Sequence, residues 1–187
     1  AYLPVLCDKV LMTEGSELYL ASPALVKAAI GQQVDREQLE RAAMHARVSG
    51  TIDFHEIDDP ACLLRMRSLI ALLPADAGAP DTFAAPDRDV HAVYDLPEEY
   101  DVHDVLASVL DGGSMQEYKT GYGQTLVCAY AAVAGHKVGI VANQRQRCKT
   151  AAGELQIGSV IYHDSADKAA RFVMDCNQSS LPILFFQ

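Results

Sequence analysis

The sequence predicts an α/β protein, because helical and strand-like patterns alternate along its 187 residues. Residues 22–30 and 58–73 start with helix-capping residues and repeat apolar side chains at helical spacing. Residues 125–134 and 137–142 are rich in β-branched and small apolar residues, as in closely packed strands. Residues 181–186 are entirely apolar apart from one proline, which favours a strand at the centre of a sheet.

Composition and charge exclude several classes of function. The net charge is −10, so binding along a nucleic-acid backbone is disfavoured. Trp is absent and aromatic residues make up 7%, which disfavours a surface on which bases stack. No run of eighteen apolar residues occurs, so we expect no membrane span. The sequence therefore indicates a soluble protein that binds neither nucleic acid nor membrane.

The five cysteines are scattered and form no C-x-x-C pair. Zinc sites need Cys and His at short spacing, and the six histidines are equally dispersed, so we expect no metal site. The pattern predicts reduced, mostly buried thiols in an intracellular protein, either cytoplasmic or, in a eukaryote, in the mitochondrial matrix.

Short strands and helices alternate in the first part of the chain. Residues 1–12 predict a buried strand interrupted by Asp8-Lys9, and residues 18–20 a second short strand. Ser22 is suited to cap a helix whose first residue is Pro23, and Gly31 ends that helix.

Two further helices are predicted before residue 74. Asp35 caps one that ends near residues 45–48, after which Ser49-Gly50 turns the chain into an extended segment, 51–54. Asp58 starts the other, whose apolar face consists of Leu63, Met66, Leu69, Ile70 and Leu73.

Residues 74–100 differ from the segments on either side. Four prolines fall in this stretch, and residues 75–104 hold nine acidic residues against one arginine. Proline stiffens a chain and like charges repel, so we predict an extended, solvated linker at 75–100.

A second unit begins at Asp101 with an amphipathic helix over residues 102–110. A short strand at 115–118 precedes the two runs at 125–134 and 137–142, which Gly135-His136 joins as an antiparallel hairpin. Residues 146–158 predict a loop, and Asp164 or Ser165 caps a last helix. Its apolar face is expected to consist of Ala166, Ala169, Ala170, Val173 and Met174.

Both ends fall within apolar runs, which suggests an internal piece of a longer chain. Residues 1–12 are strand-like from the first position, and the run at 181–186 has no cap after it. A domain that stops within a buried strand leaves its sheet unfinished.

Several strings, in this order, resemble the carboxyltransferase subunit of biotin-dependent acyl-CoA carboxylases, the propionyl-, methylcrotonoyl- and geranyl-CoA carboxylase family. The resemblance covers nearly the whole chain. The matching strings are A-Y-L-P at 1–4, L-Y-L-A-S-P-A-L-V-K-A-A-I-G at 18–31, H-A-R-V-S-G at 45–50, Y-D-V-H-D-V-L at 100–106, D-G-G at 111–113, V-G-I-V-A-N-Q at 138–144, D-K-A-A-R-F-V at 167–173, C-N at 176–177 and L-P-I-L-F at 181–185.

The resemblance implies two crotonase-like domains, each a spiral of ββα units. Residues 1–74 would form the C-terminal half of the first, 75–100 the acidic, proline-rich linker and 101–187 the N-terminal half of the second. It also implies a hexamer whose active sites lie between the first domain of one subunit and the second domain of another. The partner that the resemblance implies is a biotin carboxylase or biotin carboxyl carrier subunit.

The implied reaction transfers a carboxyl group from carboxybiotin to an acyl-CoA through an enolate. Backbone N–H groups in glycine-rich turns suit such a charge, because their dipoles are already in place. In this family the released biotin nitrogen serves as the base, so no Ser/His or paired-carboxylate device is needed. The Thr125-Leu126-Val127 run after Tyr122-Gly123 favours a methylcrotonoyl- or geranyl-like substrate.

Two groups of site residues follow from the resemblance. Ala1 adjoins the family's first oxyanion turn, and Tyr2, Leu20, Ala21, Ser22 and Pro23 are expected to line the acyl-CoA site. Ala142 and Asn143, at the carboxyl end of a strand, are expected to line the CoA or biotin cleft.

Other candidates have simpler structural explanations. His45, near a helix end, is interpreted as a satisfied structural group, and Arg147 and Lys149 as residues of a solvated loop rather than ligands of CoA phosphates. Cys128 and Cys176 are predicted to be core residues.

The alternative function is a crotonase-fold subunit that binds CoA or has a structural role without catalysis. A plain enoyl-CoA hydratase or isomerase is disfavoured, because such enzymes have one crotonase unit and no linker between two.

Overall fold

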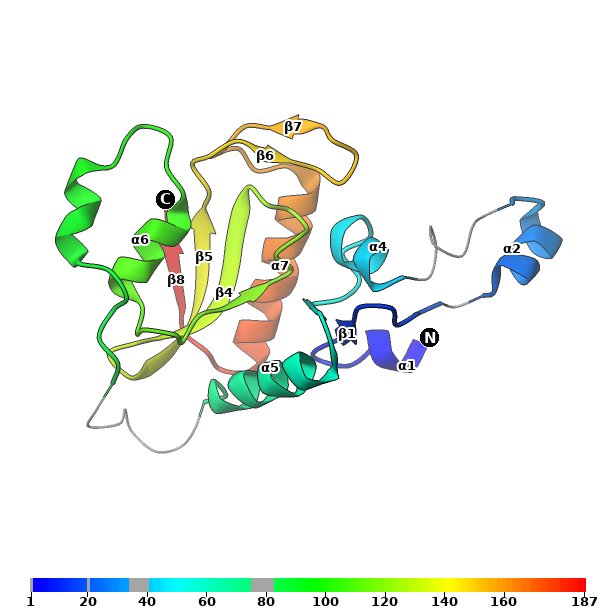
Figure 1. The fold of residues 1–187 in the computed structure, drawn as a ribbon, viewed down its shortest axis with the longest axis horizontal. Helices are drawn as coiled ribbons and strands as arrows, with labels where there is room; N and C mark the ends of the chain where they lie inside the picture. Colours follow the sequence, from blue (N-terminus) through cyan, green and yellow to red (C-terminus); the bar gives the residue numbers. More distant parts are fainter. Residues whose placement is uncertain (1, 20, 34–40, 75–82) are drawn as a thin grey trace.

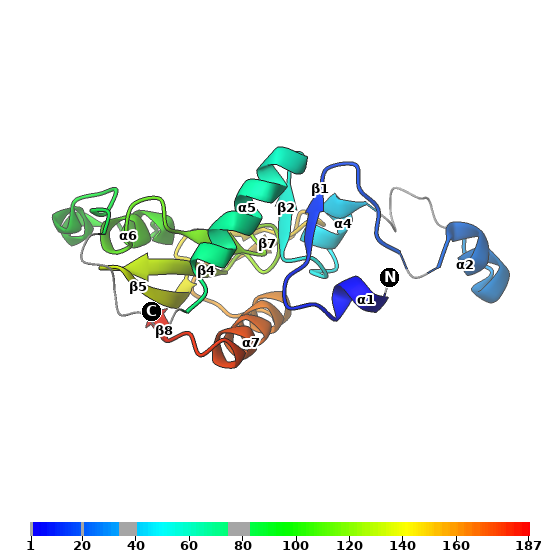
Figure 2. The same ribbon diagram turned by 90° about the horizontal axis from the view of Figure 1, so that it is seen from below.

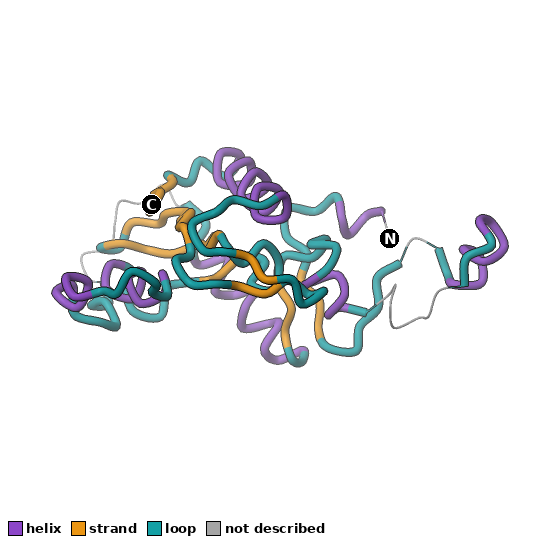
Figure 3. Tube along the Cα trace, turned by 90° about the horizontal axis from the view of Figure 1, so that it is seen from above, coloured by secondary structure: helices purple, strands orange, loops and turns teal. Residues whose placement is uncertain are grey.

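A four-stranded sheet forms the centre of the molecule, in a computed structural model that describes residues 2–19, 21–33, 41–74 and 83–187. Its strand order is β3-β4-β5-β8, with β8 parallel to β5 and the other pairs antiparallel. Figure 3 shows these strands gathered in the half of the molecule that holds the C-terminus. The strands are β3 (Gln116–Tyr118), β4 (Leu126–Val133), β5 (His136–Asn143) and β8 (Ile183–Phe186).

The predicted hairpin is confirmed, with its turn one residue earlier than expected. Strands β4 and β5 pair from Leu126 opposite Asn143 to Val133 opposite His136. The turn residues are Ala134 and Gly135, with φ of 50° and 78°. Two consecutive positive φ values are typical of the tight turns that match strand twist, so His136 is free to pair as the first residue of β5.

Helix α6 (Val102–Val109) covers one face of the sheet, as its amphipathic pattern predicted. Leu106 is fully buried and packs with Val102 and Leu110 against β4 and β5. Small residues of the sheet, such as Ala129 and Ala142, are also buried in this layer, which lets the helix approach closely.

Helix α7 (His163–Gln178) covers the opposite face, so the second unit has three layers (Figure 2). Phe172 and Cys176 are fully buried against Cys128 and Tyr130 of β4. A Cβ on Gly139 would lie 2.6 Å from the Cys176 sulfur, so glycine is required at this close approach.

The predicted start of α7 is wrong, and its predicted apolar face is right only for Ala169 and Val173, which pack against the core. Tyr162 precedes the helix, and its N–H donates to Oγ of Ser165 (2.9 Å), so Ser165 lies in the first turn. Met174 is 71% exposed, whereas Lys168 and Phe172 face the sheet. The large ring of Phe172 fills the space over the hairpin, and the helix rotates to bury it together with Lys168.

Strand β8 is an edge strand of the described sheet rather than the predicted central one. Within the described ranges its strand neighbour is β5, and Phe185 is 68% exposed. The apolar composition of 181–186 predicted the strand correctly but not its position.

The first part of the chain builds a smaller unit around a two-stranded parallel pair. The strands are β1 (Leu11–Thr13) and β2 (Phe54–Glu56). The predicted strand over 1–12 is wrong for its first part, which forms the short helix α1 (Tyr2–Val5) and an exposed bend. No strand forms at 18–19; Glu17 makes an isolated bridge with Arg41 instead, and Leu20 lies outside the described residues.

Helix α2 (Pro23–Ile30) has the predicted ends but lies apart from the rest of the described chain (Figure 1). Ser22 accepts a hydrogen bond from the N–H of Leu25 (3.4 Å), and Gly31 ends the helix with φ of 72°. None of the residues of α2 is buried.

The two remaining helices of this part are α4 (Ala42–Arg47) and α5 (Asp59–Ala71). Helix α4 ends where predicted, while its expected cap, Asp35, lies outside the described residues. Asp58 caps α5 by accepting from the N–H of Ala61 (2.8 Å), as predicted. Of the predicted apolar face of α5, Leu69 packs against the core, whereas Leu63, Met66, Ile70 and Leu73 are exposed.

The described part of the linker, residues 83–100, is largely exposed but not extended. It forms a 3₁₀ helix, η1 (Val90–Asp95), in contact with α6, and Arg88 forms an ion pair with Asp104. The N–H of Arg88 also donates to the carbonyl of Ala107 (3.0 Å). These contacts hold the segment against α6. The ion pair between Arg88 and Asp104 offsets the repulsion between the acidic residues of the linker and those of α6.

The predicted loop at 146–158 contains a small hairpin, β6 (Cys148–Lys149) with β7 (Leu155–Gln156). Among the helices that the structure describes, none combines the length and the hydropathy that a membrane span requires.

Candidate functional site

The end of β5 is the first candidate site, and its residues differ in accessibility. Ala142 is fully buried in the layer under α6, so its side chain belongs to the core. Asn143 is half-buried and, because side chains alternate along a strand, lies on the α7 face of the sheet. Of these two predicted residues, only Asn143 has a side chain outside the core.

Gln144, which sequence reasoning did not select, organises this end of the sheet. Its Oε1 accepts from the backbone N–H groups of Val102 (3.0 Å) and Arg145 (2.9 Å). Its Nε2 donates to Oδ1 of Asp101 (2.8 Å). Gln144 thereby ties the start of α6 to the end of β5. The one sequence signal for it was its place at the end of the V-G-I-V-A-N-Q string.

His103 lies between two carboxylates beside this tie. Its Nδ1 is 2.6 Å from Oδ1 of Asp101, and its Nε2 is 3.0 Å from Oε2 of Glu117. The hydrogen bond to Glu117, with that to Asp101, raises the pKa of His103 to about 9 against the opposing effect of burial. His103 is therefore protonated at neutral pH and is not poised as a general base there.

Asp101 is correspondingly held as a carboxylate. Burial acts to raise its pKa, but the hydrogen bonds from Gln144 and His103 outweigh burial, and the pKa is lowered. The cluster of Asp101, His103, Glu117 and Gln144 is thus a charged, mutually satisfied network that positions backbone.

The described residues of the predicted acyl-CoA group, which belong to the first part, do not meet Asn143 within this chain. Ala1 and Leu20 lie outside the described residues, and Tyr2 is the first residue of α1. Ser22 is an exposed helix cap next to Pro23, and Ala21 is half-buried. Figures 1 and 2 both place α2 at the opposite end of the molecule from β5.

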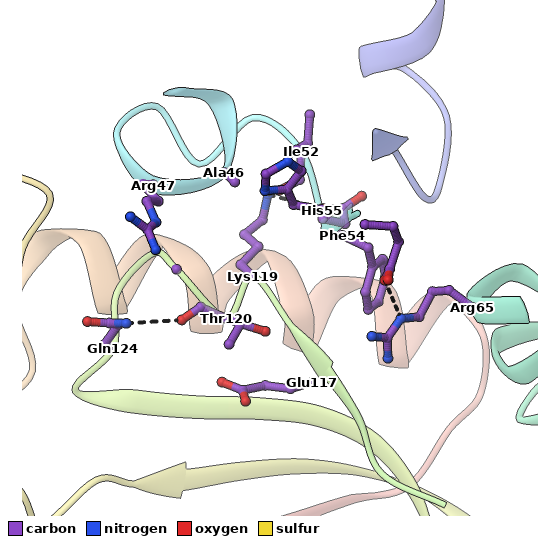
Figure 4. A pocket seen from close by; sticks show the side chains of 13 residues that line it. Ala46, Arg47, Ile52, Phe54, His55, Arg65, Glu117, Lys119, Thr120 and Gln124 are labelled. Carbon is purple, nitrogen blue, oxygen red and sulfur yellow. Dashed lines mark hydrogen bonds and ion pairs between the residues drawn. The ribbon is translucent and has the colours of Figure 1, made fainter. Parts of the chain in front are cut away.

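The second candidate site is a polar pocket of about 240 Å³ between the two parts of the chain, which we call the seam pocket (Figure 4). One wall comes from α4, β2 and α5, and the other from β3 and the turn after it. The lining residues are Ala46, Arg47, Ile52, Asp53, Phe54, His55, Glu56, Arg65, Glu117, Lys119, Thr120, Gly121 and Gln124.

Lys119 joins the two walls. Its Nζ is 3.0 Å from Oδ1 of Asp53 and also donates to the carbonyls of Gly50 and Ile52. Burial lowers the pKa of Lys119, although the adjacent Asp53 opposes that shift. The backbone of Lys119 has φ of 48°, which is uncommon for a residue other than glycine and often found at functional sites.

A second ion pair closes the pocket at its other end. Nε of Arg65 is 2.6 Å from Oε1 of Glu56, and the same guanidinium donates to Oε1 of Gln116 (2.5 Å). Arg65 thereby connects α5 to β3. With Lys119, it sets the relative position of the two walls.

The described nucleophiles and histidines form no catalytic triad. His45 Nδ1 is 3.2 Å from Oγ of Ser49, but its Nε2 is 2.7 Å from the carbonyl of Leu18, which fixes the loop and supports the predicted structural role. Burial raises the pKa of Cys128 to about 11 and that of Cys176 to about 12, so both are thiols in the core, as predicted.

The expectation of mostly buried cysteines is wrong for the other three. All five are free, but Cys7 is exposed and Cys62 and Cys148 are half-exposed. The described residues hold no group of three or more His, Cys, Asp or Glu side chains placed to bind a metal ion.

The whole chain, residues 1–187, matches the carboxyl transferase domain family. The chain belongs to this family. It is 34% identical over 192 residues to the methylmalonyl-CoA carboxyltransferase 12S subunit of Propionibacterium freudenreichii subsp. shermanii, covering 98% of this chain and 35% of that protein. It is 35% identical over 201 residues to the biotin-dependent 3-methylcrotonyl-coenzyme A carboxylase beta1 subunit of Mycobacterium tuberculosis, covering 100% and 34%.

Solved structures agree with these relatives. A crystal structure of transcarboxylase 12S with hydrolyzed methylmalonyl-coenzyme A bound superimposes with a TM-score of 0.79 at 34% identity, covering 98% of this chain and 36% of that one. This confirms the predicted resemblance to the carboxyltransferase subunits and the α/β fold. The chain spans about a third of the length of these relatives.

Proposed function

We propose that the protein carrying this chain is the carboxyltransferase component of a biotin-dependent acyl-CoA carboxylase. The observation that carries the proposal is that the carboxyl transferase family matches all of residues 1–187. Relatives named as carboxyltransferase or carboxylase subunits share about a third of its residues over nearly its whole length.

We further propose two crotonase-like parts, residues 1–74 and 101–187, joined by the linker at 75–100. The strand pairing supports this division. The pair β1-β2 uses residues of the first part alone, and the four-stranded sheet uses residues of the second part alone. The two parts then meet through side chains such as Lys119 and Arg65.

The chemistry requires that an acyl-CoA lose a proton from its α-carbon, or from the γ-carbon of an unsaturated acyl group such as methylcrotonoyl, and that the resulting enolate be held. His103 is protonated and the two core thiols keep their protons, so none of these three groups can act as that base at neutral pH. We propose that backbone N–H donors stabilise the negative charge on the enolate oxygen, as the family resemblance implies. Biotin supplies the carboxyl group and, once released, the nitrogen that accepts the proton.

At the end of β5 we propose Asn143 as the residue that contacts the ligand. Its amide both donates and accepts, which suits a thioester or a ureido group, and it is half-buried rather than enclosed. Ala142 contributes backbone at most, since its methyl group is in the core.

Ala1, Tyr2, Leu20, Ala21, Ser22 and Pro23 remain proposed for the acyl-CoA side. The separation of α2 from β5 favours a site completed by a second copy, so we propose a homo-oligomer, as the 12S transcarboxylase is named a hexamer. The other proposed partner is the biotinylated carrier with its biotin carboxylase.

For the substrate we favour a methylcrotonoyl-type acyl-CoA. Relatives of similar identity are named for methylcrotonoyl-CoA and for methylmalonyl-CoA. The identity of the acyl group is therefore proposed separately from the reaction type. Eukaryotic relatives from Drosophila melanogaster and Arabidopsis thaliana are named mitochondrial, and we keep the cytoplasm or the mitochondrial matrix as the proposed location.

The test combines the full-length subunit with its biotinylated partner, ATP and labelled bicarbonate, and compares propionyl-, methylcrotonoyl- and geranyl-CoA. We expect acyl-dependent fixation of label, highest with methylcrotonoyl-CoA. Saturable CoA binding without fixation for any acyl-CoA would contradict the enzymatic proposal and favour a non-catalytic CoA-binding subunit.

A further inference from the structure

The charges that line the seam pocket are almost all neutralised by partners within the chain. Asp53 pairs with Lys119, and Glu56 pairs with Arg65. His55 Nε2 is 2.9 Å from Glu14, and Glu117 is 3.0 Å from His103. Among the described residues that line the pocket, Arg47 is the charged side chain left without such a partner.

Arg47 is the last residue of α4 and extends towards the turn at 120–124 (Figure 4). Its guanidinium makes no hydrogen bond or ion pair with any residue in the described ranges. A guanidinium has five N–H donors in a planar fork that matches carboxylate and phosphate oxygens. The pocket therefore presents one uncompensated positive charge with unused donors.

The opposite wall is shaped to accept this side chain. A Cβ on Gly121 would lie 2.9 Å from Cγ of Arg47 and 3.4 Å from the carbonyl of Ala46. Contacts of 2.9 Å are closer than real Cβ atoms make, so a side chain at 121 would displace Arg47. Glycine at this position lets the stem of Arg47 cross the turn.

The turn itself adds donors. Lys119 has φ of 48°, and the next two backbone N–H groups, of Thr120 and Gly121, have no acceptor within the described part of the chain. Successive N–H groups in such a turn form a concavity that suits an anion. The N–H of Lys119 is already used by the carbonyl of Asp53 (2.9 Å), which holds the turn in place.

We propose that the seam pocket binds a phosphate-type oxyanion, held by the guanidinium of Arg47 and the N–H groups of Thr120 and Gly121. At about 240 Å³ the pocket admits one phosphate group with its water. The ligand is inorganic phosphate or a phosphate monoester, such as the 3′-phosphate of CoA. The site does not depend on carboxyl transfer and goes beyond the function proposed above.

The competing explanation is that Arg47 merely complements the C-terminal end of α4, where positive charge is favourable. That explanation needs no ligand. The interaction with the helix end also does not explain why the residue at 121, which the Arg47 side chain approaches closely, is a glycine.

The test is a ³¹P NMR titration of the full-length protein with inorganic phosphate at low ionic strength. Arg47→Gln should weaken binding at least about tenfold, the change expected when a charge-assisted hydrogen bond is lost. Gly121→Ala should weaken it similarly with all charges kept. The matched control is Arg67→Gln, an exposed arginine on α5 outside the pocket, and should leave binding unchanged.

Because Arg47 is exposed, its replacement does not threaten folding, and Arg47→Lys separates charge from geometry by keeping the charge without the fork. Undetectable binding to the unmodified protein, or equal binding to Arg47→Gln and Arg67→Gln, would overturn the proposal.

Competition identifies the source of the phosphate. If it is the 3′-phosphate of CoA, CoA displaces inorganic phosphate and dephospho-CoA does not. Arg47→Gln then weakens the binding of CoA but leaves the binding of dephospho-CoA unchanged. If the ligand is free phosphate, neither CoA nor dephospho-CoA competes. Both patterns support the oxyanion site, and neither requires that the protein transfer a carboxyl group.

Discussion

Helices α5 and α6 were both predicted from apolar residues at helical spacing, but their surroundings differ greatly. Leu106 of α6 is fully buried against the sheet, whereas Leu64 of α5 is 66% exposed. The second part of the chain encloses both faces of its sheet, with α6 on one side and α7 on the other. The first part has a smaller core cluster of its own, which consists of Val10, Met12, Ala42, Ala46 and Ile52 with Leu18 beside it. Its Phe54 is buried in the cluster that α7 covers.

Helical periodicity therefore predicts a helix but not the surface that the helix covers. Helix α5 contacts β1, β2 and β3, through residues such as Leu69 and Arg65. Its other large apolar residues, Leu63, Leu64, Met66 and Ile70, are exposed. Substitutions should therefore have much larger effects in the second part than at matched positions in the first.

The largest expected effect is at Phe172, which is fully buried against Tyr130 with ring centroids 4.8 Å apart. Phe172→Ala should lower the free energy of unfolding by about 3–5 kcal/mol, because it leaves a cavity between α7 and the sheet. Urea denaturation followed by circular dichroism measures this change. Phe185→Ala, at the 68% exposed edge, is the control and should change it by less than about 1 kcal/mol.

A matched leucine pair tests the comparison directly. Leu106→Ala should cost about 2–5 kcal/mol, and Leu64→Ala no more than about 0.5 kcal/mol, in the same denaturation experiment. Equal costs would mean that α5 is as well covered as α6 in the protein. The contrast between the two parts would then be wrong.

Lys168 is expected to weaken the second part, since it is fully buried and its Nζ has no hydrogen-bond partner among the described residues. Burial lowers the pKa of Lys168, so between that pKa and about 10.5 the unfolded chain binds more protons. Stability therefore rises with pH through this window.

Lys168→Met should stabilise the protein by about 1–4 kcal/mol and remove that rise, because Met fills similar space without a charge. Melting temperatures measured from pH 7 to 10.5 test it, with the exposed Lys149→Met as control. A loss of stability at neutral pH would show that the ammonium group of Lys168 is needed.

The smallest expected effect is at His103, whose side chain is 39% exposed. Its pKa is raised to about 9 by Glu117 and Asp101, above the ordinary 6.5, so its contribution to stability is complete below pH 6.5. It is lost as pH rises through about 9. His103→Gln should therefore lower the melting temperature at pH 6 and have no effect above pH 10. A difference that grew with pH would contradict the assignment of charge.

Features set by neighbouring residues were predictable from sequence. Ser22 and Asp58 were identified as helix caps because a cap needs only its own helix end. The hairpin of β4 and β5 was predictable because its turn and pairing are local. Membership of the family was predictable because short sequence motifs of the family occur in the same order along the chain.

Features that depend on contacts between distant segments were not. Lys119 forms an ion pair with Asp53, and the stem of Arg47 lies against Gly121. Both contacts join residues from the two parts, so no local sequence pattern predicts them. The buried face of α7 was mispredicted because its alanines also follow helical spacing. The burial of the large Phe172 ring against the sheet sets which face of the helix is covered.

We propose that the protein carrying this chain moves a carboxyl group from carboxybiotin to an acyl-CoA. The most direct test is a single-turnover experiment with a biotin carrier carboxylated in advance with ¹⁴C, mixed with the full-length subunit and methylcrotonoyl-CoA in the absence of ATP. We expect acid-stable label in the acyl-CoA, and a several-fold slower transfer with Asn143→Ala than with the exposed control Asn177→Ala. Release of all label as bicarbonate, at the same rate with and without acyl-CoA, would contradict it.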